Sequence, residues 1–323
     1  MPLPESATAF LANIVERLRN VRPKQRIVFP EGDDTRVQQA AARLEREDLA
    51  VPILLGAGYT VSEQDARKYA RLYFERRRAK GITEIEAAEI ASRPLYTAAL
   101  MVAAGDADGF VGGAANTTAE TVRATFHCIG PAPSVQTVSS AFIVAVQNRA
   151  FGHNGLLAFA DCSIVIDPSP VELAEIAIAT AATTRRLLHA DPIVALLSFS
   201  TKGSTHHPWV DKVTEALRIL RERAPSLMVD GELQADAALM ETVGQSKAPG
   251  SPVAGRANTL IFPDIASGNI AVKLVERLGA AVALGPFLQG LAKPANDLSR
   301  GCSAGDIYGA AVVTALESAH ASL

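Results

Sequence analysis

The stretch Arg26-Ile-Val-Phe-Pro-Glu-Gly-Asp-Asp-Thr35 decides the fold class, because it joins a strand, a turn and the start of a helix. Its apolar half predicts a short buried strand, and its Gly and Asp residues predict a turn before a helix that begins at Thr35. The same order returns along the chain, with further strands expected at 52–55, 108–113, 156–159, 163–166, 194–200 and 259–264. Strands that alternate with helices are typical of parallel βαβ units, so the sequence predicts an α/β fold.

The helix after Ser169 has the clearest boundaries. Ser169 suits the N-cap and Pro170 suits the first helical position. Glu172 lies in the first turn, and Arg185 and Arg186 lie near the end, so each charge complements the helix dipole. Other helices are expected at 6–20, 62–80, 84–104, 270–279 and 304–320, and a loop is expected at 244–256.

Length and charge limit the class of protein. The chain has 323 residues, which is more than the ~250–300 residues that one hydrophobic core usually holds, so two domains are expected. Its 31 basic and 34 acidic residues leave a net charge of −3. Such a surface offers no basic field for nucleic acid or for an anionic membrane, and we expect neither as a partner.

The cysteines indicate a reducing compartment. Cys128, Cys162 and Cys302 are an odd number without CxxC spacing, which predicts neither a disulfide framework nor a thiolate zinc site. The sequence also contains no run of 18 apolar residues and no pattern of a cleaved signal peptide. We therefore expect a cytoplasmic protein.

Three common cofactor motifs are missing from the sequence. It contains no G-x-x-x-x-G-K-S/T loop, no G-x-G-x-x-G after an expected strand, and no H-E-x-x-H. These absences argue against nucleotide hydrolysis, conventional dinucleotide binding and zinc hydrolysis. We expect no metal ion and no bound cofactor.

The densest polar segment, Asn296-Asp-Leu-Ser-Arg-Gly-Cys-Ser303, lies just before a helical pattern. The hydroxyl of Ser299, the guanidinium of Arg300 and the glycine that follows favour an anion, because free backbone N–H groups and the positive helix end point to the same place. Asp306 follows Ser303 at the spacing of a capping box. Two interpretations of Asp306 therefore stay open, a helix cap and a chemical role.

Two other polar segments give weaker signals. Thr118 and Arg123 follow a glycine turn and open an expected helix, where a Thr is also an ordinary cap. Lys202 follows a buried strand, at the edge where open parallel sheets usually bind ligands. Each signal alone is too weak to assign a function.

Taken together, the motifs resemble one family. The segment Leu291-Ala-Lys-Pro-Ala-Asn-Asp-Leu-Ser-Arg-Gly-Cys-Ser303 is the most specific. It is preceded, in order, by matching segments at 26–32, 106–111, 117–123, 159–162, 200–204, 229–234, 260–264 and 267–269. From about residue 10 to the C-terminus, the chain closely resembles the phosphate acetyl/butyryltransferase family, which includes phosphotransacetylases.

The resemblance implies an acyltransferase that moves an acetyl group reversibly between coenzyme A and inorganic phosphate. Acetyl-CoA and phosphate would give CoA and acetyl phosphate, by direct thiolate attack in a ternary complex and without a cofactor. The implied subunit has two parallel-sheet lobes with helices on both faces and a cleft between them, with the topology of isocitrate and isopropylmalate dehydrogenases, and it forms a homodimer. The expected domains are 1–138 with 288–323, and 139–287.

The resemblance also implies roles for individual residues. Asp306 would be the base for the coenzyme A thiol, Ser299 would donate a hydrogen bond to the carbonyl oxygen, and Arg300 would hold the phosphoryl group. The residues expected to bind substrate are Arg123, Arg77, Arg277, Thr118, Lys202 and Asn269. Which of Arg76, Arg77 and Arg78 faces the site stays open.

Three other functions compete with this interpretation. The first is a phosphate propionyl- or butyryltransferase, and the second is a non-catalytic acyl-CoA sensing domain, as in the C-terminal domain of some malic enzymes. The third is a metal-dependent hydroxy-acid dehydrogenase, whose aspartate cluster is not evident. The presence of Ser299, Arg300 and Asp306 together favours an enzyme, and Cys302 is expected to pack in the structure rather than act as a nucleophile.

Overall fold

The computed structural model describes residues 4–56 and 58–321, and it divides into two units. Unit 1 comprises Met1–Leu11 and Ser134–Gly290, and unit 2 comprises Ala12–Pro133 and Leu291–Leu323. The expected domains differ from this division by a few residues at each internal boundary and by the first eleven residues, which belong to unit 1. Each unit is described by itself below.

Unit 2 is built on a parallel sheet with the strand order β2-β1-β3-β10. The strands are β1 (Arg26–Phe29), β2 (Val51–Leu54), β3 (Gly109–Gly112) and β10 (Ala295–Asp297). Its helices are α1 (Glu5–Arg19), which contains the boundary with unit 1, α2 (Thr35–Arg46), α3 (Glu63–Arg77), α4 (Glu84–Ala91), α5 (Pro94–Ala104), α6 (Thr118–Cys128) and α12 (Ala304–Ala321). A short 3₁₀ helix follows α3 at Arg78–Lys80.

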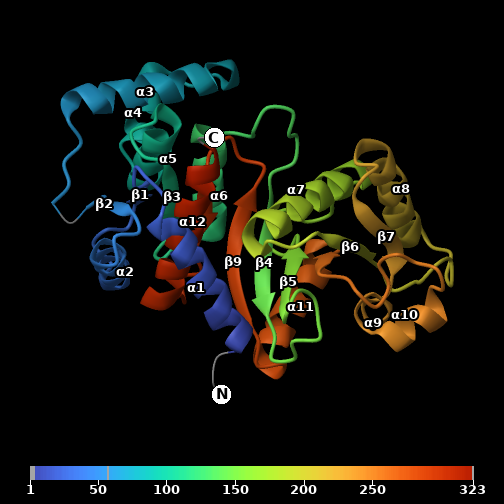
Figure 1. Ribbon diagram of the computed structural model, residues 1–323. Coiled ribbons are helices and arrows are strands. Elements are labelled where there is room, and N and C mark those ends of the chain that lie inside the picture. Colours follow the sequence, from blue (N-terminus) through green and yellow to red (C-terminus); the bar gives the residue numbers. More distant parts are fainter. Residues whose placement is uncertain (1–3, 57, 322–323) are drawn as a thin grey trace. The chain divides into compact units, whose positions relative to one another are not determined.

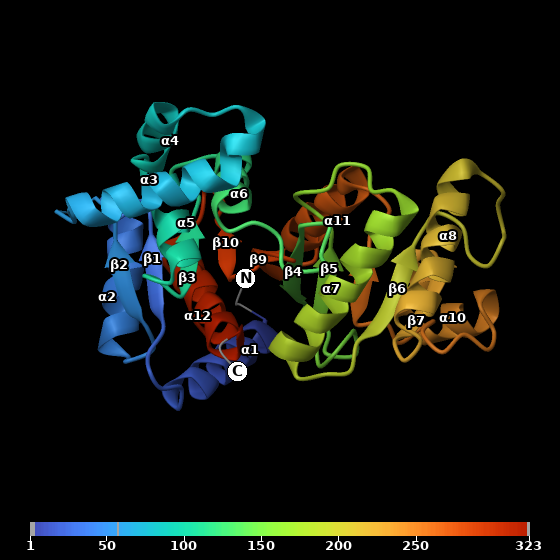
Figure 2. The same ribbon diagram turned by 90° about the horizontal axis from the view of Figure 1, so that it is seen from above.

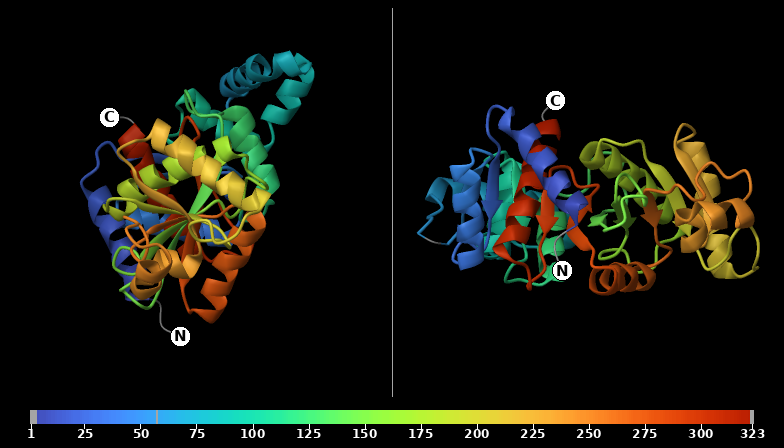
Figure 3. Two further views of the ribbon diagram at one scale, coloured as in Figure 1. Left: turned by 90° about the vertical axis from the view of Figure 1, so that its right-hand side faces the viewer. Right: turned by 60° about the horizontal axis from the view of Figure 1, so that its bottom comes forward.

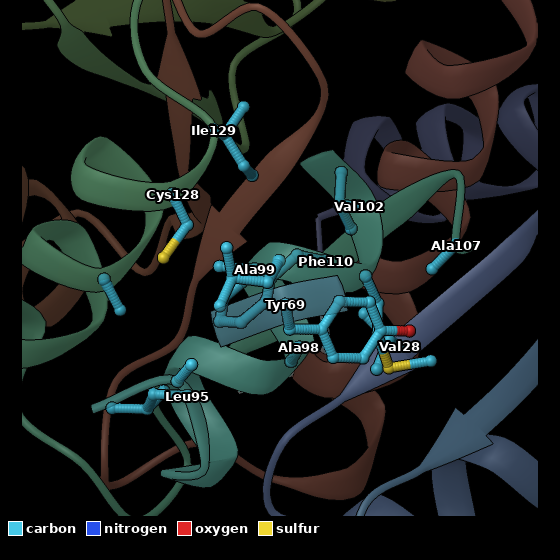
Figure 4. Packing of buried hydrophobic residues seen from close by; sticks show 14 of the residues in the cluster. Val28, Tyr69, Leu95, Ala98, Ala99, Val102, Ala107, Phe110, Cys128 and Ile129 are labelled. Carbon is cyan, nitrogen blue, oxygen red and sulfur yellow. The ribbon is translucent and has the colours of Figure 1, made fainter. Parts of the chain in front are cut away.

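Alternate residues of these strands face opposite layers of helices, as the two-residue period of a strand requires. Val28 and Phe110 are fully buried in a cluster with side chains of α3, α4, α5 and α6 (Figure 4). On the other face, Ile27 and Gly109 meet α12, which lies beside β3 in Figure 2. Helix α12 also packs on α2. A Cβ at Gly109 would lie 2.5 Å from the Thr314 side chain, so glycine allows α12 to approach the sheet closely.

Unit 1 is built on a mixed sheet with the strand order β9-β4-β5-β8-β6-β7 (Figure 1). The strands are β4 (Ser139–Ala145), β5 (Leu156–Ala160), β6 (Ile193–Leu197), β7 (Met228–Leu233), β8 (Thr259–Ile261) and β9 (Val282–Gln289). Strands β5, β8, β6 and β7 pair in parallel, whereas β4 is antiparallel to both of its neighbours. The expected α/β fold class is confirmed, and β4 is the antiparallel strand of a sheet whose other pairs are mostly parallel.

Helices cover both faces of this sheet (Figure 3). They are α7 (Pro170–Leu188), α8 (Pro208–Arg223), α9 (Ala235–Leu239), α10 (Glu241–Lys247) and α11 (Ile265–Leu278). In β6, Val194 and Leu196 pack against α7 and α8, whereas Ala195 and Leu197 pack with residues of α9 and α11. Successive residues of one strand thus serve two cores, which explains why the strand is apolar throughout.

Most helices begin where the sequence predicts. Ser169 caps α7, and its capping box with Glu172 is complete. The helix expected at 84–104 is instead two helices, because Pro94 occupies the first position of α5 and ends the helical run before it. None of the helices in residues 4–56 and 58–321 combines the length and hydropathy needed to span a membrane.

Three other local expectations differ from the structure. Residues 163–166 form no strand, because the backbone N–H groups of Ser163, Ile164 and Val165 donate to the Asp161 carboxylate and fold the chain into a loop. The helix expected at 270–279 begins at Ile265, because Asp264 caps it by accepting a hydrogen bond from the Ser267 N–H at 2.8 Å. The segment expected to be a loop at 244–256 starts within α10.

Candidate active site

Three loops of unit 2 leave the same edge of its sheet. The strands β1, β3 and β10 run in parallel, so their carboxyl ends lie together. They are followed by the turn 30–34, the loop 113–117 and the loop 298–303, and the last two lead into α6 and α12. This edge is where open α/β sheets place their ligands.

Glu31 organises the loop after β3. Its carboxylate accepts hydrogen bonds from the backbone N–H groups of Gly113, Ala114, Ala115 and Asn116 at 3.0–3.2 Å. The Asn116 side chain donates a further one at 2.7 Å. Consecutive N–H groups of this kind form a nest for an anion, and here the protein's own carboxylate fills it. The loop is thereby fixed just before α6, which carries Thr118 and Arg123.

The loop after β10 presents three exposed residues, Ser299, Arg300 and Gly301. The Gly301 N–H donates to Ser299 Oγ at 3.3 Å. A hydroxyl that accepts one hydrogen bond still has its own proton to donate. Ser299 can therefore donate to the carbonyl oxygen of a ligand.

Asp306 completes a capping box at the start of α12. Its Oδ2 accepts hydrogen bonds from the Ser303 N–H at 2.8 Å and from Ser303 Oγ at 2.9 Å, while the Asp306 N–H donates to Ser303 Oγ at 3.2 Å. Among the described residues, nothing donates to Asp306 Oδ1, and the residue is exposed. The helix cap predicted from the spacing is present, and the second carboxylate oxygen is left for chemistry.

Arg300 and Arg123 carry positive charge that is not neutralised by close ion pairs. Within the described part of the chain, no carboxylate lies within 4 Å of either guanidinium. The positive charges of Arg123 and Arg300 both act on the carboxylate of Glu120, an exposed residue in the first turn of α6. Hydrogen bonds from Thr117 hold the pKa of Glu120 below its ordinary value, and the two arginines lower it further. The structure thus brings Arg123 and Arg300 to one region of unit 2.

Arg77 extends this region along α6. Burial lowers the pKa of His127, and the positive charges of Arg77 and Arg123 lower it further, so both charges act on the same ring. Arg76 instead donates to the Ile129 carbonyl at 3.1 Å, and Arg78 pairs with Glu75 on the surface. Of the three consecutive arginines, only Arg77 acts together with Arg123 on the pKa of His127.

A buried carboxylate lies beneath the same loops. Asp297 is 1% exposed, and neither of its oxygens has a hydrogen-bond partner in the described structure. Burial raises its pKa to about 6, against the effect of the neighbouring Thr118 and Thr121 hydroxyls. A Cβ at Gly113 would lie 2.5 Å from Asp297 Oδ1, so the loop after β3 packs directly on this carboxylate. Sequence reasoning did not single out Asp297.

Cys302 is buried and ill suited to attack a substrate. Burial raises the pKa of its thiol, and the nearby Arg36 opposes the rise only in part. Because the thiolate is the nucleophilic form, a raised pKa lowers the reactivity of the side chain. This agrees with a packing role.

The predicted residues of unit 1 have structural partners or lie apart. Lys202 Nζ lies 2.5 Å from Asp230 Oδ1 and donates to the Gly231 carbonyl at 2.8 Å. Asn269 Nδ2 donates to the Cys162 carbonyl at 3.0 Å. Arg277 is exposed in the last turn of α11, eight residues after Asn269 and thus about 12 Å along the helix. Asn269 and Arg277 therefore lie apart on α11, and the substrate contacts of all three residues stay predictions.

The arrangement in unit 2 suits an anionic substrate with a carbonyl group. It offers two arginines without close carboxylate partners, a hydroxyl with a free proton and an exposed carboxylate oxygen. Among residues 4–56 and 58–321, no three His, Cys, Asp or Glu side chains are grouped so as to hold a metal ion. Such a site can bind phosphate, stabilise a carbonyl oxygen and accept a proton.

Comparison with known families defines the class of protein. The model of the phosphate acetyl/butaryl transferase family matches residues 9–315, which is nearly the whole chain. The chain belongs to this family.

Individual relatives are more specific. A phosphate acetyltransferase of Acetivibrio thermocellus is 43% identical over 327 residues, which cover 96% of this chain and 98% of the relative. The crystal structure of a phosphotransacetylase from Streptococcus pyogenes matches with a TM-score of 0.89 and 42% identity, over 97% of this chain and 99% of that one. A protein assigned as a 4-hydroxythreonine-4-phosphate dehydrogenase from Salmonella typhimurium, at 13% identity, shares the fold with a TM-score of 0.52 over 91% of this chain and 99% of that one.

Proposed function

We propose that this protein is a phosphate acetyltransferase that converts acetyl-CoA and phosphate reversibly into CoA and acetyl phosphate. Relatives named phosphate acetyltransferase are 42–47% identical to this protein over at least 90% of its chain. The observation that carries the proposal is the loop after β10, where a serine donor, an arginine without a close carboxylate and a free carboxylate oxygen lie within eight residues.

In the direction of CoA acetylation, the thiol sulfur of CoA attacks the carbonyl carbon of acetyl phosphate. A C–S bond forms, the C–O bond to the phosphoryl group breaks, and phosphate leaves with the bonding electrons. The thiol proton passes to Asp306 Oδ1, the oxygen that the helix cap leaves unoccupied. The Ser299 hydroxyl donates to the carbonyl oxygen as negative charge develops there, and Arg300 holds the phosphoryl group.

The proton transfer needs help from the arginines. In water, a thiol of pKa ~8.5 and a carboxylic acid of pKa ~3.9 differ by about 6 kcal/mol in proton affinity. The dipole of one helix supplies only ~0.3–1 kcal/mol. The uncompensated charges of Arg123 and Arg300 therefore have to stabilise the thiolate, in addition to binding phosphate.

Substrate binding beyond this loop rests on the family resemblance. We propose that Arg77, Arg123 and Thr118 of unit 2, and Lys202, Asn269 and Arg277 of unit 1, contact CoA or phosphate. Lys202 would do so while paired with Asp230.

Assembly and location are also proposals. We propose a homodimer in the cytoplasm, as the resemblance implies. The three free, buried cysteines fit a reducing compartment.

The test is the loss of thioester absorbance when the purified protein is mixed with acetyl-CoA, with and without phosphate. Loss that requires phosphate and yields acetyl phosphate supports the proposal. Propionyl-CoA and butyryl-CoA measured in parallel decide between acyl chains. Thioester loss that is independent of phosphate, or binding of acetyl-CoA without turnover, would contradict it.

A further inference from the structure

Arg36, in the first turn of α2, has every donor of its guanidinium engaged by the protein. Nε and Nη2 donate to the two carboxylate oxygens of Asp34 at 3.0 and 2.7 Å. Nη2 also donates to the Ala114 carbonyl at 2.8 Å. Nη1 donates to the carbonyls of Arg300 and Cys302 at 2.9 and 2.8 Å. A guanidinium has five N–H groups, and all five are used, so none is left for a substrate.

The first of the two carbonyls from the loop after β10 belongs to the peptide between Arg300 and Gly301. This peptide bond is trans, so its C=O and N–H groups point in opposite directions. The C=O accepts from Arg36, and the N–H donates to Ser299 Oγ. One rigid peptide plane therefore connects the Arg36 guanidinium to the Ser299 hydroxyl.

The second carbonyl belongs to the peptide between Cys302 and Ser303, and it repeats the arrangement. This bond is also trans. Its C=O accepts from Arg36, and its N–H donates to Asp306 Oδ2 at 2.8 Å. A second peptide plane thus connects the same guanidinium to the carboxylate that is proposed to take the thiol proton.

From this geometry, and resting on the function proposed above, we infer that Arg36 is the positioning residue of the reaction, fixing Ser299 and Asp306 through two peptide groups. The positive guanidinium polarises both peptides, which strengthens the hydrogen bonds that their N–H groups donate. Asp34 holds the guanidinium in one orientation through a bidentate pair. Arg36 does not contact substrate, so its effect falls on turnover rather than on substrate binding.

Lysine cannot replace this arrangement. An ammonium group keeps the charge but lacks the planar fork that pairs with Asp34 and reaches the carbonyls of Arg300 and Cys302 together. Arg43 of the same helix offers a matched control. It pairs with Glu47 at 2.8 Å and lies 3.7 Å from the centre of the Tyr308 ring on α12, and in the described residues it donates no hydrogen bond to the loop after β10.

The experiment compares the wild type with Arg36→Ala, Arg36→Lys and Arg43→Ala, using variants shown to be folded by circular dichroism. Phosphate-dependent consumption of acetyl-CoA gives kcat and both KM values. We expect both Arg36 variants to lose about tenfold to a hundredfold in kcat, with KM within a few-fold, because small misplacements of reacting groups cause losses of this size. Millimolar guanidinium should restore part of the kcat of Arg36→Ala, and Arg43→Ala should keep its kcat.

Amide hydrogen exchange gives a readout that does not depend on activity. Exchange at Gly301 and Ser303 should be faster in Arg36→Ala than in the wild type, and unchanged in Arg43→Ala. If Arg36→Ala does not fold, Arg36→Lys decides by the same two measurements. Wild-type kcat in a folded Arg36 variant, a change confined to KM, or unchanged exchange at both amides overturns the inference. An inactive wild type would instead overturn the proposed function.

Discussion

Asp297→Asn should make the protein more stable at alkaline pH, although Asp297 lies directly before the loop of the proposed active site. The Asp297 carboxyl is fully buried, and neither oxygen has a hydrogen-bond partner in the described structure. Burial raises its pKa from 3.8 to about 6. The native protein therefore holds a proton that the unfolded chain releases between these two pH values.

The size of the effect follows from the two pKa values. Because the native pKa is the higher one, the contribution to stability is fully present below pH ~4 and is lost as the pH rises through about 6. The loss amounts to about 3 kcal/mol at most. An amide stays neutral at every pH, so Asp297→Asn avoids the loss.

Urea unfolding at several pH values between 4 and 8 measures the difference between the wild type and the variant. We expect Asp297→Asn to exceed the wild type in unfolding free energy at pH 8 and the gap to close near pH 4. Asp108→Asn is a control of opposite sign. Burial raises the pKa of the Asp108 carboxyl, but the hydrogen bonds and the ion pair with Arg26 lower it by more. The pKa of Asp108 is therefore below its ordinary value. Its loss should therefore destabilise the protein at pH 8, and less so in acid.

A gap between the wild type and Asp297→Asn that does not change with pH would refute the reasoning. So would a variant that is less stable than the wild type at pH 8, since that result would mean that the ionised carboxylate has a stabilising partner.

Two further predictions concern catalysis. Arg300→Ala should slow phosphate-dependent turnover about tenfold to a hundredfold, because a charge-assisted contact of roughly 1.5–3 kcal/mol is lost, while the exposed position leaves the unfolding free energy nearly unchanged; wild-type phosphate kinetics would remove Arg300 from the site. Initial rates with both substrates varied should give intersecting lines in double-reciprocal plots, as direct transfer in a ternary complex requires. Parallel lines, or an acetyl group trapped on Cys302, would indicate a covalent intermediate instead.

The alternation of strands and helices could be predicted because its signals are local. The strand and turn at 26–34 and the capped helix after Ser169 depend on side chains within a few residues of one another. In contrast, β10 has only three residues, and its own sequence does not indicate that it pairs with β3, about 180 residues earlier. The antiparallel direction of β4 has the same cause, since it follows from pairing with β5 and β9 and not from local composition.

The site divides in the same way. Ser299, Arg300 and Asp306 lie in one short motif, so their proximity could be predicted from the sequence. The role of Arg36 could not be predicted, because it depends on the Arg300 and Cys302 carbonyls, more than 260 residues away. Contacts made by backbone carbonyls cannot be inferred from residue types. Glu31 likewise binds backbone N–H groups after another strand. The available signal was the position of both residues after β1, at the sheet edge where the other loops meet.

The most direct test is the turnover of Asp306→Asn, measured together with its unfolding free energy on the same samples at neutral pH. The amide can still accept the hydrogen bonds of the helix cap through its oxygen, so we expect a stability loss of no more than ~1 kcal/mol. It cannot take a proton, so kcat should fall by about 10²–10⁴, and the deficit should shrink as the pH approaches the pKa of the thiol. Turnover within a few-fold of the wild type, with or without a lower stability, would show that Asp306 is only a helix cap and that another group removes the thiol proton.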